Sequence, residues 1–195
     1  MLRVRSFPPI ENAGARVLIL GSMPGGASLA AGQYYAHPQN LFWPIMSALL
    51  GAGPGFAYAA RTRLLKANGI ALWDVLESCV REGSLDSAIE EATIAVNDFA
   101  AFYRTHPRIG RVFFNGAKAE ASYRRFVLPS VREIGGPREY FRLPSTSPAH
   151  AALPFDRKRD AWRIVTGSHH PAAPEPVKAA RRPRIVRKDP LLRKN

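Results

Sequence analysis

Cysteine is almost absent from this chain of 195 residues, which has only Cys79. One cysteine excludes an intrachain disulfide, a cysteine-rich zinc site and an iron–sulfur cluster held by four cysteines. Long apolar runs are also missing, and the opening Met1-Leu2-Arg3-Val4-Arg5 lacks the apolar core of a signal peptide. We therefore expect a cytoplasmic protein that neither enters a membrane nor depends on a metal or a cofactor.

Two common nucleotide-binding signatures are absent as well. The glycine-rich stretch 21–26 does not follow Gly-x-Gly-x-x-Gly, and no acidic residue stands at a strand end about twenty positions further on. No Gly-Lys-Ser or Gly-Lys-Thr occurs, which excludes a P-loop. The sequence therefore argues against a nucleotide-binding enzyme of the general Rossmann type.

Acidic residues are few. The chain has 15 of them against 28 lysines and arginines, so its formal net charge is +13 and its pI is about 10.7. This charge favours a polyanionic partner, although charge alone does not separate nucleic acid from an acidic membrane surface.

The basic residues are concentrated near the C-terminus. The stretch 167–195 holds eight lysines and arginines, two acidic residues and five prolines. We divide the chain into a folded domain at 1–166 and a basic, proline-rich tail at 167–195, which we expect to be disordered. The tail adds non-specific affinity for phosphates, or it is a solvated extension without a role.

Apolar segments alternate with helical patterns through residues 1–166. Four segments are typical of parallel strands, namely 16–20, 70–73, 111–114 and 140–143. The helical patterns cover 41–50, 58–68, 96–104, 117–127 and 155–165. This alternation predicts an α/β fold, a three-layer αβα sandwich around a four-stranded, mainly parallel sheet.

The loops after the four strands hold the candidate functional residues. They are the turn 21–25, then Asp74, then Asn115 with Gly116, and finally the loop 144–148. Because the carboxyl ends of parallel strands lie at one edge of a sheet, we expect these loops to form a single cleft.

Two motifs are spaced in a recognisable way. Gly21-Ser22-Met23-Pro24-Gly25 follows the first strand, and Ala36-His37-Pro38-Gln39-Asn40-Leu41-Phe42-Trp43 begins twelve residues after Pro24. Together they resemble the first motif of the uracil-DNA glycosylase superfamily, in which mismatch-specific members share Gly-x-x-Pro-Gly and His-Pro-x-Asn-x-Phe-Trp. Ser28-Leu29 and Gln33-Tyr34-Tyr35 bring the string closer to the hypoxanthine-DNA glycosylase branch.

The resemblance implies a monofunctional DNA glycosylase in base excision repair. Such an enzyme hydrolyses the N-glycosidic bond of a deaminated base, with hypoxanthine expected first and uracil second, and leaves an abasic site. The implied partner is DNA that contains a deaminated base, bound by a monomer associated with the nucleoid. A bifunctional lyase is not expected, because neither motif contains a lysine that could form a Schiff base.

The fourth loop resembles the second motif of the superfamily, which grips the DNA backbone. The residues that the resemblance assigns to DNA binding are Pro144, Ser145, Thr146, Ser147 and, as a wedge candidate, His150. Leu153 is a second wedge candidate. Small hydroxyl side chains and backbone N–H groups can approach phosphates closely, and proline keeps a loop rigid. Without the resemblance, this stretch would also fit an ordinary surface turn.

The catalytic residue is not where many relatives have it. They carry an Asn or Asp inside the turn, whereas Ser22 and Met23 stand there in this chain. The implied catalytic residue of the hypoxanthine branch is the downstream Asn40, whose amide could hold a water, although asparagine also caps helices well. His37 could stabilise negative charge on the departing base or support its loop.

Residues around the turn are expected to hold the base. Gly21, Ser22 and Met23 would line the pocket, and the resemblance places Tyr35 where relatives stack an aromatic ring on the flipped base. Asp74 and Asn115 could read the edge of the base, or they could cap their loops.

Two points stay open at this stage. The stretch 83–87 also resembles the hypoxanthine branch, but nothing in it indicates a role. Because the turn lacks the usual catalytic residue, the alternative is a catalytically silent nucleic-acid-binding module with the same fold.

Overall fold

The main sheet of the protein has four strands that all run parallel. In the computed structural model, which describes residues 3–53, 55–134 and 136–167, they are β2 (Val17–Gly21), β3 (Ile70–Asp74), β6 (Arg111–Asn115) and β7 (Glu139–Leu143). Their order is β3-β2-β6-β7, and Leu18 of β2 lies between Ala71 of β3 and Val112 of β6. Each predicted strand is confirmed to within one residue at either end.

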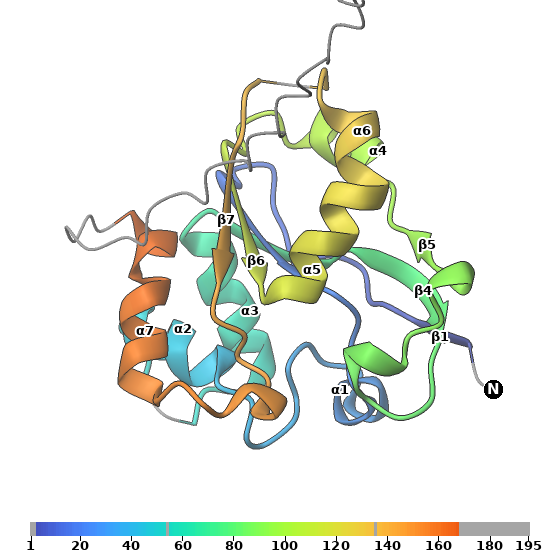
Figure 1. The fold of residues 1–195 in the computed structure, drawn as a ribbon. Helices are drawn as coiled ribbons and strands as arrows, with labels where there is room; N and C mark the ends of the chain where they lie inside the picture. The colour runs from blue at the N-terminus through green and yellow to red at the C-terminus, as the bar shows by residue number, and fades with distance from the viewer. Residues whose placement is uncertain (1–2, 54, 135, 168–195) are drawn as a thin grey trace, which may run out of the picture.

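Helices cover both faces of this sheet (Figure 1). One layer consists of α2 (Phe42–Leu50), α3 (Tyr58–Ala67) and α7 (Phe155–Trp162), and the opposite layer of α4 (Phe99–Thr105), α5 (Ala117–Ser122) and α6 (Leu128–Val131). The predicted three-layer αβα sandwich is therefore confirmed. None of the helices in the described part of the chain is long and apolar enough to cross a membrane.

A second, smaller sheet was not predicted. It is antiparallel, and its order is β1-β4-β5, with bounds Arg3–Arg5, Leu76–Val80 and Ala95–Val96. The predicted helix 96–104 was wrong at its start, because Val96 pairs with Leu76 of β4. The helix begins only at Phe99, after Asp98, whose carboxylate accepts a hydrogen bond from the backbone N–H of Ala101 at 2.9 Å.

Two predicted helices change their hydrogen-bonding pattern along their length. The pattern at 117–127 is α-helical in α5, then becomes a π-helix over Tyr123–Val127 before α6. The pattern at 155–165 is α-helical to Trp162 and then forms a 3-10 turn over Arg163–Thr166. A short helix α1 (Gly26–Ala31) follows the first turn and had no clear pattern of its own. Further 3-10 turns cover Asp86–Ala88, Glu91–Thr93 and Pro148–His150.

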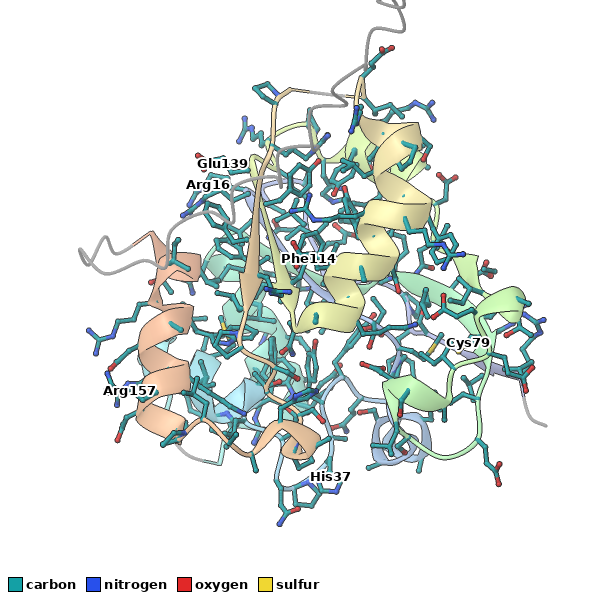
Figure 2. The ribbon with its side chains drawn as sticks, viewed as in Figure 1. Arg16, His37, Cys79, Phe114, Glu139 and Arg157 are labelled. Atoms are coloured by element: carbon teal, nitrogen blue, oxygen red, sulfur yellow. The ribbon has the colours of Figure 1, made fainter. Side chains whose placement is uncertain are left out.

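The core lies on both sides of the parallel sheet. The side chains of Leu18, Ile19, Leu20, Phe113 and Phe114 are fully buried. Figure 2 shows Phe114 in the interior, between β6 and the helix layer that contains α5. Strands buried on both faces read as continuous apolar runs, which is why these strands could be predicted from the sequence.

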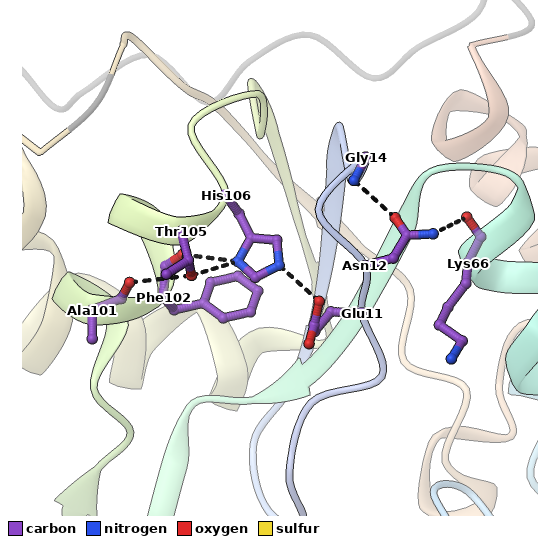
Figure 3. Close-up of polar contacts among 8 residues, drawn as sticks. All are labelled: Glu11, Asn12, Gly14, Lys66, Ala101, Phe102, Thr105 and His106. Carbon is purple, nitrogen blue, oxygen red and sulfur yellow. Dashed lines mark hydrogen bonds and ion pairs between the residues drawn. The ribbon is translucent and has the colours of Figure 1, made fainter.

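The segment that leads into β2 is fastened to two helices (Figure 3). Glu11 Oε2 lies 2.9 Å from His106 Nε2 at the end of α4, and the His106 ring stacks on Phe102 with a centroid distance of 4.3 Å. The Asn12 amide donates a hydrogen bond to the carbonyl of Lys66 in α3 at 2.9 Å. These contacts hold the start of β2 in place. The predicted basic tail lies, from residue 168 onward, outside the described residues.

Candidate active site

The carboxyl ends of all four parallel strands meet at a cavity of about 430 Å³. This is the cleft that the positions of the loops predicted. Its lining comes from segments that are far apart in the sequence, namely 21–28, 84–87 and 145–150, together with Tyr34, Tyr35, His37, Asn40, Asp74 and Asn115.

Gly21 and Asp74 face each other at the ends of neighbouring strands, where they are partners in the register of β2 and β3. A Cβ atom on Gly21 would lie 2.2 Å from Asp74 Oδ1 and 2.9 Å from the Tyr35 hydroxyl oxygen. Both oxygens therefore occupy the space that any other side chain at Gly21 would need. The glycine permits a carboxyl and a phenol to approach the backbone of the turn.

The Asp74 carboxyl is held in its neutral form. The residue is 3% exposed, and its Oδ2 atom is buried without a hydrogen-bond partner among the described residues. The pKa of Asp74 is raised from 3.8 to about 8, mainly by burial and then by the negative charge of Asp86, while the positive charge of Arg81 opposes both. At neutral pH this carboxyl therefore carries a proton, so that it can donate one hydrogen bond and accept others.

Tyr35 has an unusual backbone conformation at the edge of the cavity. Its φ of 55° makes it the one non-glycine residue with positive φ among those that the structure describes. Its ring stacks on Phe42 with centroids 4.2 Å apart, so a base could stack only on the other face. The hydroxyl is buried and makes no well-formed hydrogen bond to any of the described residues. Burial, and then the nearby Asp74, raises the pKa of this phenol.

Of the two polar atoms in the Asn40 side-chain amide, only the oxygen has a hydrogen-bond partner among the described residues. Its Oδ1 accepts a hydrogen bond at 2.9 Å from the backbone N–H of Phe42, at the start of α2. No acceptor among the described residues takes up its Nδ2. This contact lies one residue before the N-cap Leu41, which has no side-chain cap hydrogen bond, and it leaves the two N–H donors of Asn40 available at the cavity.

His37 lies at the rim. Figure 2 shows it at the outer edge of the molecule, and its side chain is exposed. Its Nδ1 accepts a hydrogen bond from the backbone N–H of Gln39 at 3.2 Å, so Nε2 carries the proton in the neutral ring. The contact supports the loop, and Nε2 remains free to face a ligand.

The turn residues differ in their surroundings. Met23 is buried at 7% exposure, whereas Ser22 is half-buried and donates a hydrogen bond from its Oγ to Asp86 Oδ1 at 2.8 Å. Asp86 belongs to the loop 83–87, which supplies a wall of the cavity. Sequence reasoning missed this wall, and the only signal for it was the resemblance of that stretch to the hypoxanthine branch.

Three further hydrogen bonds join the loop 83–87 to the turn. Ser84 Oγ accepts from the backbone N–H of Gly26 at 2.8 Å. The buried guanidinium of Arg81 donates to the carbonyl of Pro24 at 2.6 Å and to that of Gly83 at 3.1 Å. Arg81 therefore positions both the turn and the loop, and its charge acts on Asp74.

Asn115, at the end of β6, supports the loop 144–150 through two hydrogen bonds. Asn115 Nδ2 donates to the hydroxyl of Thr146 at 2.8 Å, and Asn115 Oδ1 accepts from the Thr146 backbone N–H at 2.9 Å. Asn115 thus makes the loop-capping contacts that were the alternative to reading a base. Thr146 is fully buried, which leaves Ser145 and Ser147 as the half-buried hydroxyls of the loop.

Helix α7 supports both ends of the same loop. Trp162 Nε1 donates to the carbonyl of Pro144 at 3.0 Å. Lys158 is buried and donates from Nζ to the carbonyl of His150 at 2.7 Å. The side chain of His150 is exposed and lines the cavity, whereas Leu153 is exposed outside it.

Within residues 3–53, 55–134 and 136–167, no group of three or more His, Cys, Asp or Glu side chains is placed to hold a metal ion. The polar side chains at the cavity carry two carboxyls, two imidazoles, two amides and several hydroxyls. Such groups can bind an uncharged heterocycle, stabilise charge that develops on it and position water.

This fold and cavity are those of an α/β enzyme with its site at the carboxyl edge of a parallel sheet. The chain belongs to the uracil DNA glycosylase superfamily, whose family model matches residues 8–166.

Among the proteins that are similar to it are two named relatives and a solved structure. A Methanosarcina acetivorans protein named hypoxanthine DNA glycosylase is 36% identical over 162 residues, which are 83% of this chain and 96% of the relative. A Methanosarcina barkeri protein of the same name is 37% identical over 119 residues, 60% of this chain and 74% of the relative. The solution NMR structure of a provisionally named uracil DNA glycosylase from Methanosarcina acetivorans has a TM-score of 0.70 at 34% identity, covering 85% of this chain and 97% of that one.

These similarities confirm three predictions, the superfamily, the fold and the class of enzyme, which is a DNA glycosylase.

Proposed function

We propose that this protein is a monofunctional DNA glycosylase that removes hypoxanthine, and secondarily uracil, from DNA and leaves an abasic site for base excision repair. The names of the two relatives support the class of damaged base. The observation that carries the chemistry is the proton-bearing Asp74 carboxyl, buried at the cavity without a hydrogen-bond partner for its Oδ2.

A neutral Asp74 suits a base that departs as an anion. When the bond between C1′ and the base breaks, its electron pair stays on the base and negative charge reaches the ring nitrogens and the carbonyl oxygen. A carboxylic acid can donate a hydrogen bond to that oxygen, whereas a carboxylate would repel it. The same group can accept the ring N–H of hypoxanthine or uracil through its carbonyl oxygen.

Asn40 would be the second catalytic residue. The N–H donors of its Nδ2 can contact the base or hold a water, since its Oδ1 is already bonded to the N–H of Phe42. This anchored oxygen fixes the orientation of the amide, which is the preorganisation that electrostatic catalysis requires. Tyr35 would stack on the extruded base, and His37 would approach it from the rim.

The loop 144–150 would bind the DNA strand beside the extruded nucleotide. Ser145 and Ser147 can donate to phosphate oxygens, and the exposed His150 can enter the space that the base leaves in the duplex. Extruding a base costs about a few kcal/mol. We expect a monomer to bind in this way, with the positive charge of the chain strengthening its attraction to DNA.

The alternative is a nucleic-acid-binding module of the same fold that has lost catalysis. The observation that favours it is the turn, in which Ser22 and the buried Met23 stand where many members of the superfamily have Asn or Asp.

Base release separates the two functions. The purified protein, in excess over the DNA, is incubated with labelled oligonucleotides that carry one hypoxanthine, uracil or xanthine, single-stranded or paired. Hot alkali then converts each abasic site into a strand break. Release of hypoxanthine faster than uracil supports the proposal, dominant uracil release changes the substrate, and tight binding without any release supports the silent module.

A pair of substitutions at Asn40 tests its role. Asn40→Ala removes both the acceptor for the backbone N–H of Phe42, a hydrogen bond worth about 1 kcal/mol, and the N–H donors. Asn40→Asp keeps an oxygen for the N–H of Phe42 but has no N–H donor. We expect both variants to bind DNA and to release the base roughly 100-fold more slowly, while only Asn40→Ala lowers the melting temperature. Full activity of Asn40→Asp would exclude the proposed donor role.

A further inference from the structure

Asp86 is a second carboxyl at the cavity, and it comes from outside both motifs. It lies in the 3-10 turn Asp86–Ala88, far along the chain from the turn at residues 21–25. Its side chain is half-buried, unlike that of Asp74. The two carboxyls are close enough for the charge of Asp86 to raise the pKa of Asp74. One pocket thus combines a buried neutral acid with a more accessible carboxylate.

Ser22 holds this carboxylate against the turn. The 2.8 Å hydrogen bond from Ser22 Oγ occupies Oδ1 of Asp86 and leaves Oδ2 without a partner among the described residues. A carboxylate has about four acceptor sites, so Asp86 can still accept a hydrogen bond from a water. Ser22 stands where many members of the superfamily have Asn or Asp. Through its hydrogen bond it holds the Asp86 carboxylate, which comes from the loop 83–87, beside the turn.

The hydrogen bond is not needed to keep the loop in place. Ser84 joins the same loop directly to Gly26, and Arg81 links it to the turn by donating to the carbonyls of both Gly83 and Pro24. Anchoring alone thus gives no reason for an acidic side chain at Asp86.

Asp86 also has a route to solvent. It lines the main cavity and, in addition, a neighbouring cavity of about 390 Å³, whose walls include Ser87, Lys118 and His150. A water bound to Asp86 can therefore be replaced from this second cavity while a base occupies the first.

We propose that Asp86 is the catalytic carboxylate that positions and deprotonates the attacking water, with Ser22 as the residue that positions Asp86. This inference rests on the proposed glycosylase function. The C1′–N bond breaks with its electron pair leaving on the base, while the water oxygen forms a new bond to C1′. The proton of that water passes to Asp86 and then to solvent, and the base anion takes up one proton from solvent. The negative charge of Asp86 also stabilises the positive charge that develops on the sugar.

Asp86→Asn tests this role with little change in shape, because its amide oxygen can still accept the hydrogen bond from Ser22. With enzyme in saturating excess, we expect hypoxanthine release to slow roughly 100-fold, while affinity for the same oligonucleotide stays within about threefold. Asp156→Asn is the matched control. It removes the same charge from the exposed face of α7, where the Asp156 side chain is 74% exposed, and should release the base at the rate of the unmodified protein.

Substitutions at Ser22 separate positioning from folding. Ser22→Ala should slow release roughly tenfold, and Ser22→Thr, which keeps a hydroxyl, should restore most of the rate. The double exchange of Ser22→Asp with Asp86→Ser returns a carboxylate to the turn and should be faster than Asp86→Asn.

The outcomes distinguish this inference from the proposed function. If the unmodified protein releases no base, the glycosylase function fails. If it is active and Asp86→Asn stays within about threefold of its rate, the role of Asp86 is refuted while the function stands. A loss of rate in Asp86→Asn that comes with an equal loss of affinity for DNA also overturns the catalytic role.

Discussion

Replacing Asp74 by asparagine should make this protein more stable at alkaline pH. Asp74→Asn keeps the shape of the side chain and removes its ability to ionise. The carboxyl is 3% exposed, and its Oδ2 has no hydrogen-bond partner in the described part of the chain. No hydrogen bond to Oδ2 therefore compensates the folded protein for the loss of hydration when this group becomes charged, and the positive charge of Arg81 offsets only part of that loss.

The size of the effect follows from the shift in proton affinity. Each tenfold change in the acid dissociation constant, which is one pKa unit, corresponds to about 1.4 kcal/mol. Because the pKa of Asp74 is raised from 3.8 to about 8, the ionised carboxyl destabilises the folded protein by roughly 6 kcal/mol. Below about pH 4 both states keep the proton and no stability is lost. Between about pH 4 and pH 8 only the unfolded chain ionises, so stability falls by about 1.4 kcal/mol for each pH unit.

Urea unfolding followed by tryptophan fluorescence measures this difference. We expect the stability of Asp74→Asn relative to the unmodified protein to be about 4 kcal/mol greater at pH 9 than at pH 5. If the amide itself changes the free energy of unfolding, that change is the same at both pH values and cancels when they are compared. Asp156→Asn, at an exposed position, is the control and should show no such change.

Activity gives a second readout of the same proton. If the acid form of Asp74 donates to the departing base, hypoxanthine release by the unmodified protein should slow as the pH rises above about 8. Asp74→Asn should lose that alkaline decline, because its amide does not titrate. A stability difference that stays the same within about 1 kcal/mol at pH 5 and pH 9 would refute the argument that Asp74 is held neutral.

Three further predictions concern other parts of the protein. Gly21→Ala should reduce base release roughly 100-fold, because its Cβ would lie 2.2 Å from Asp74 Oδ1, whereas Gly110→Ala, with no atom within 4 Å of its Cβ, should be fully active. Lys158→Met frees the carbonyl of His150 and should speed amide exchange at 147–151, whereas the same change at the exposed neighbour Arg157 should not; equal exchange in both variants would exclude the brace. Deleting 167–195 removes eight basic and two acidic residues and should weaken DNA binding and flatten its salt dependence, and an unchanged salt slope would leave the tail without that role.

The sequence was sufficient to predict the main sheet and the first motif. The strand at 17–20 is an unbroken apolar run because it is buried on both faces, and the turn after it carries its own pattern of glycine and proline. Both signals are local. The same holds for the position of Asn40 just before α2, where its side chain accepts a hydrogen bond from the backbone N–H two residues on, a contact that asparagine favours in turns.

Tertiary structure decided where α4 begins and which side chains of the site are paired. The prediction failed at 96–104 because Val96 belongs to a strand whose partner, β4, lies elsewhere in the chain. Ser22 and Asp86 are 64 residues apart, and Asn115 and Thr146 are 31 apart, so no local pattern could pair them.

The protonation state of Asp74 is the clearest example of a property that the sequence alone does not predict. An aspartate at the end of a strand has the same sequence signature whether water or protein surrounds it. Its pKa depends on burial and on charges from Asp86 and Arg81, which the fold brings to the same cavity. The sequence by itself determined which residues stand at the carboxyl edge of the sheet. Only the tertiary structure decided which of them are paired, buried or charged, because those properties arise from contacts between distant segments.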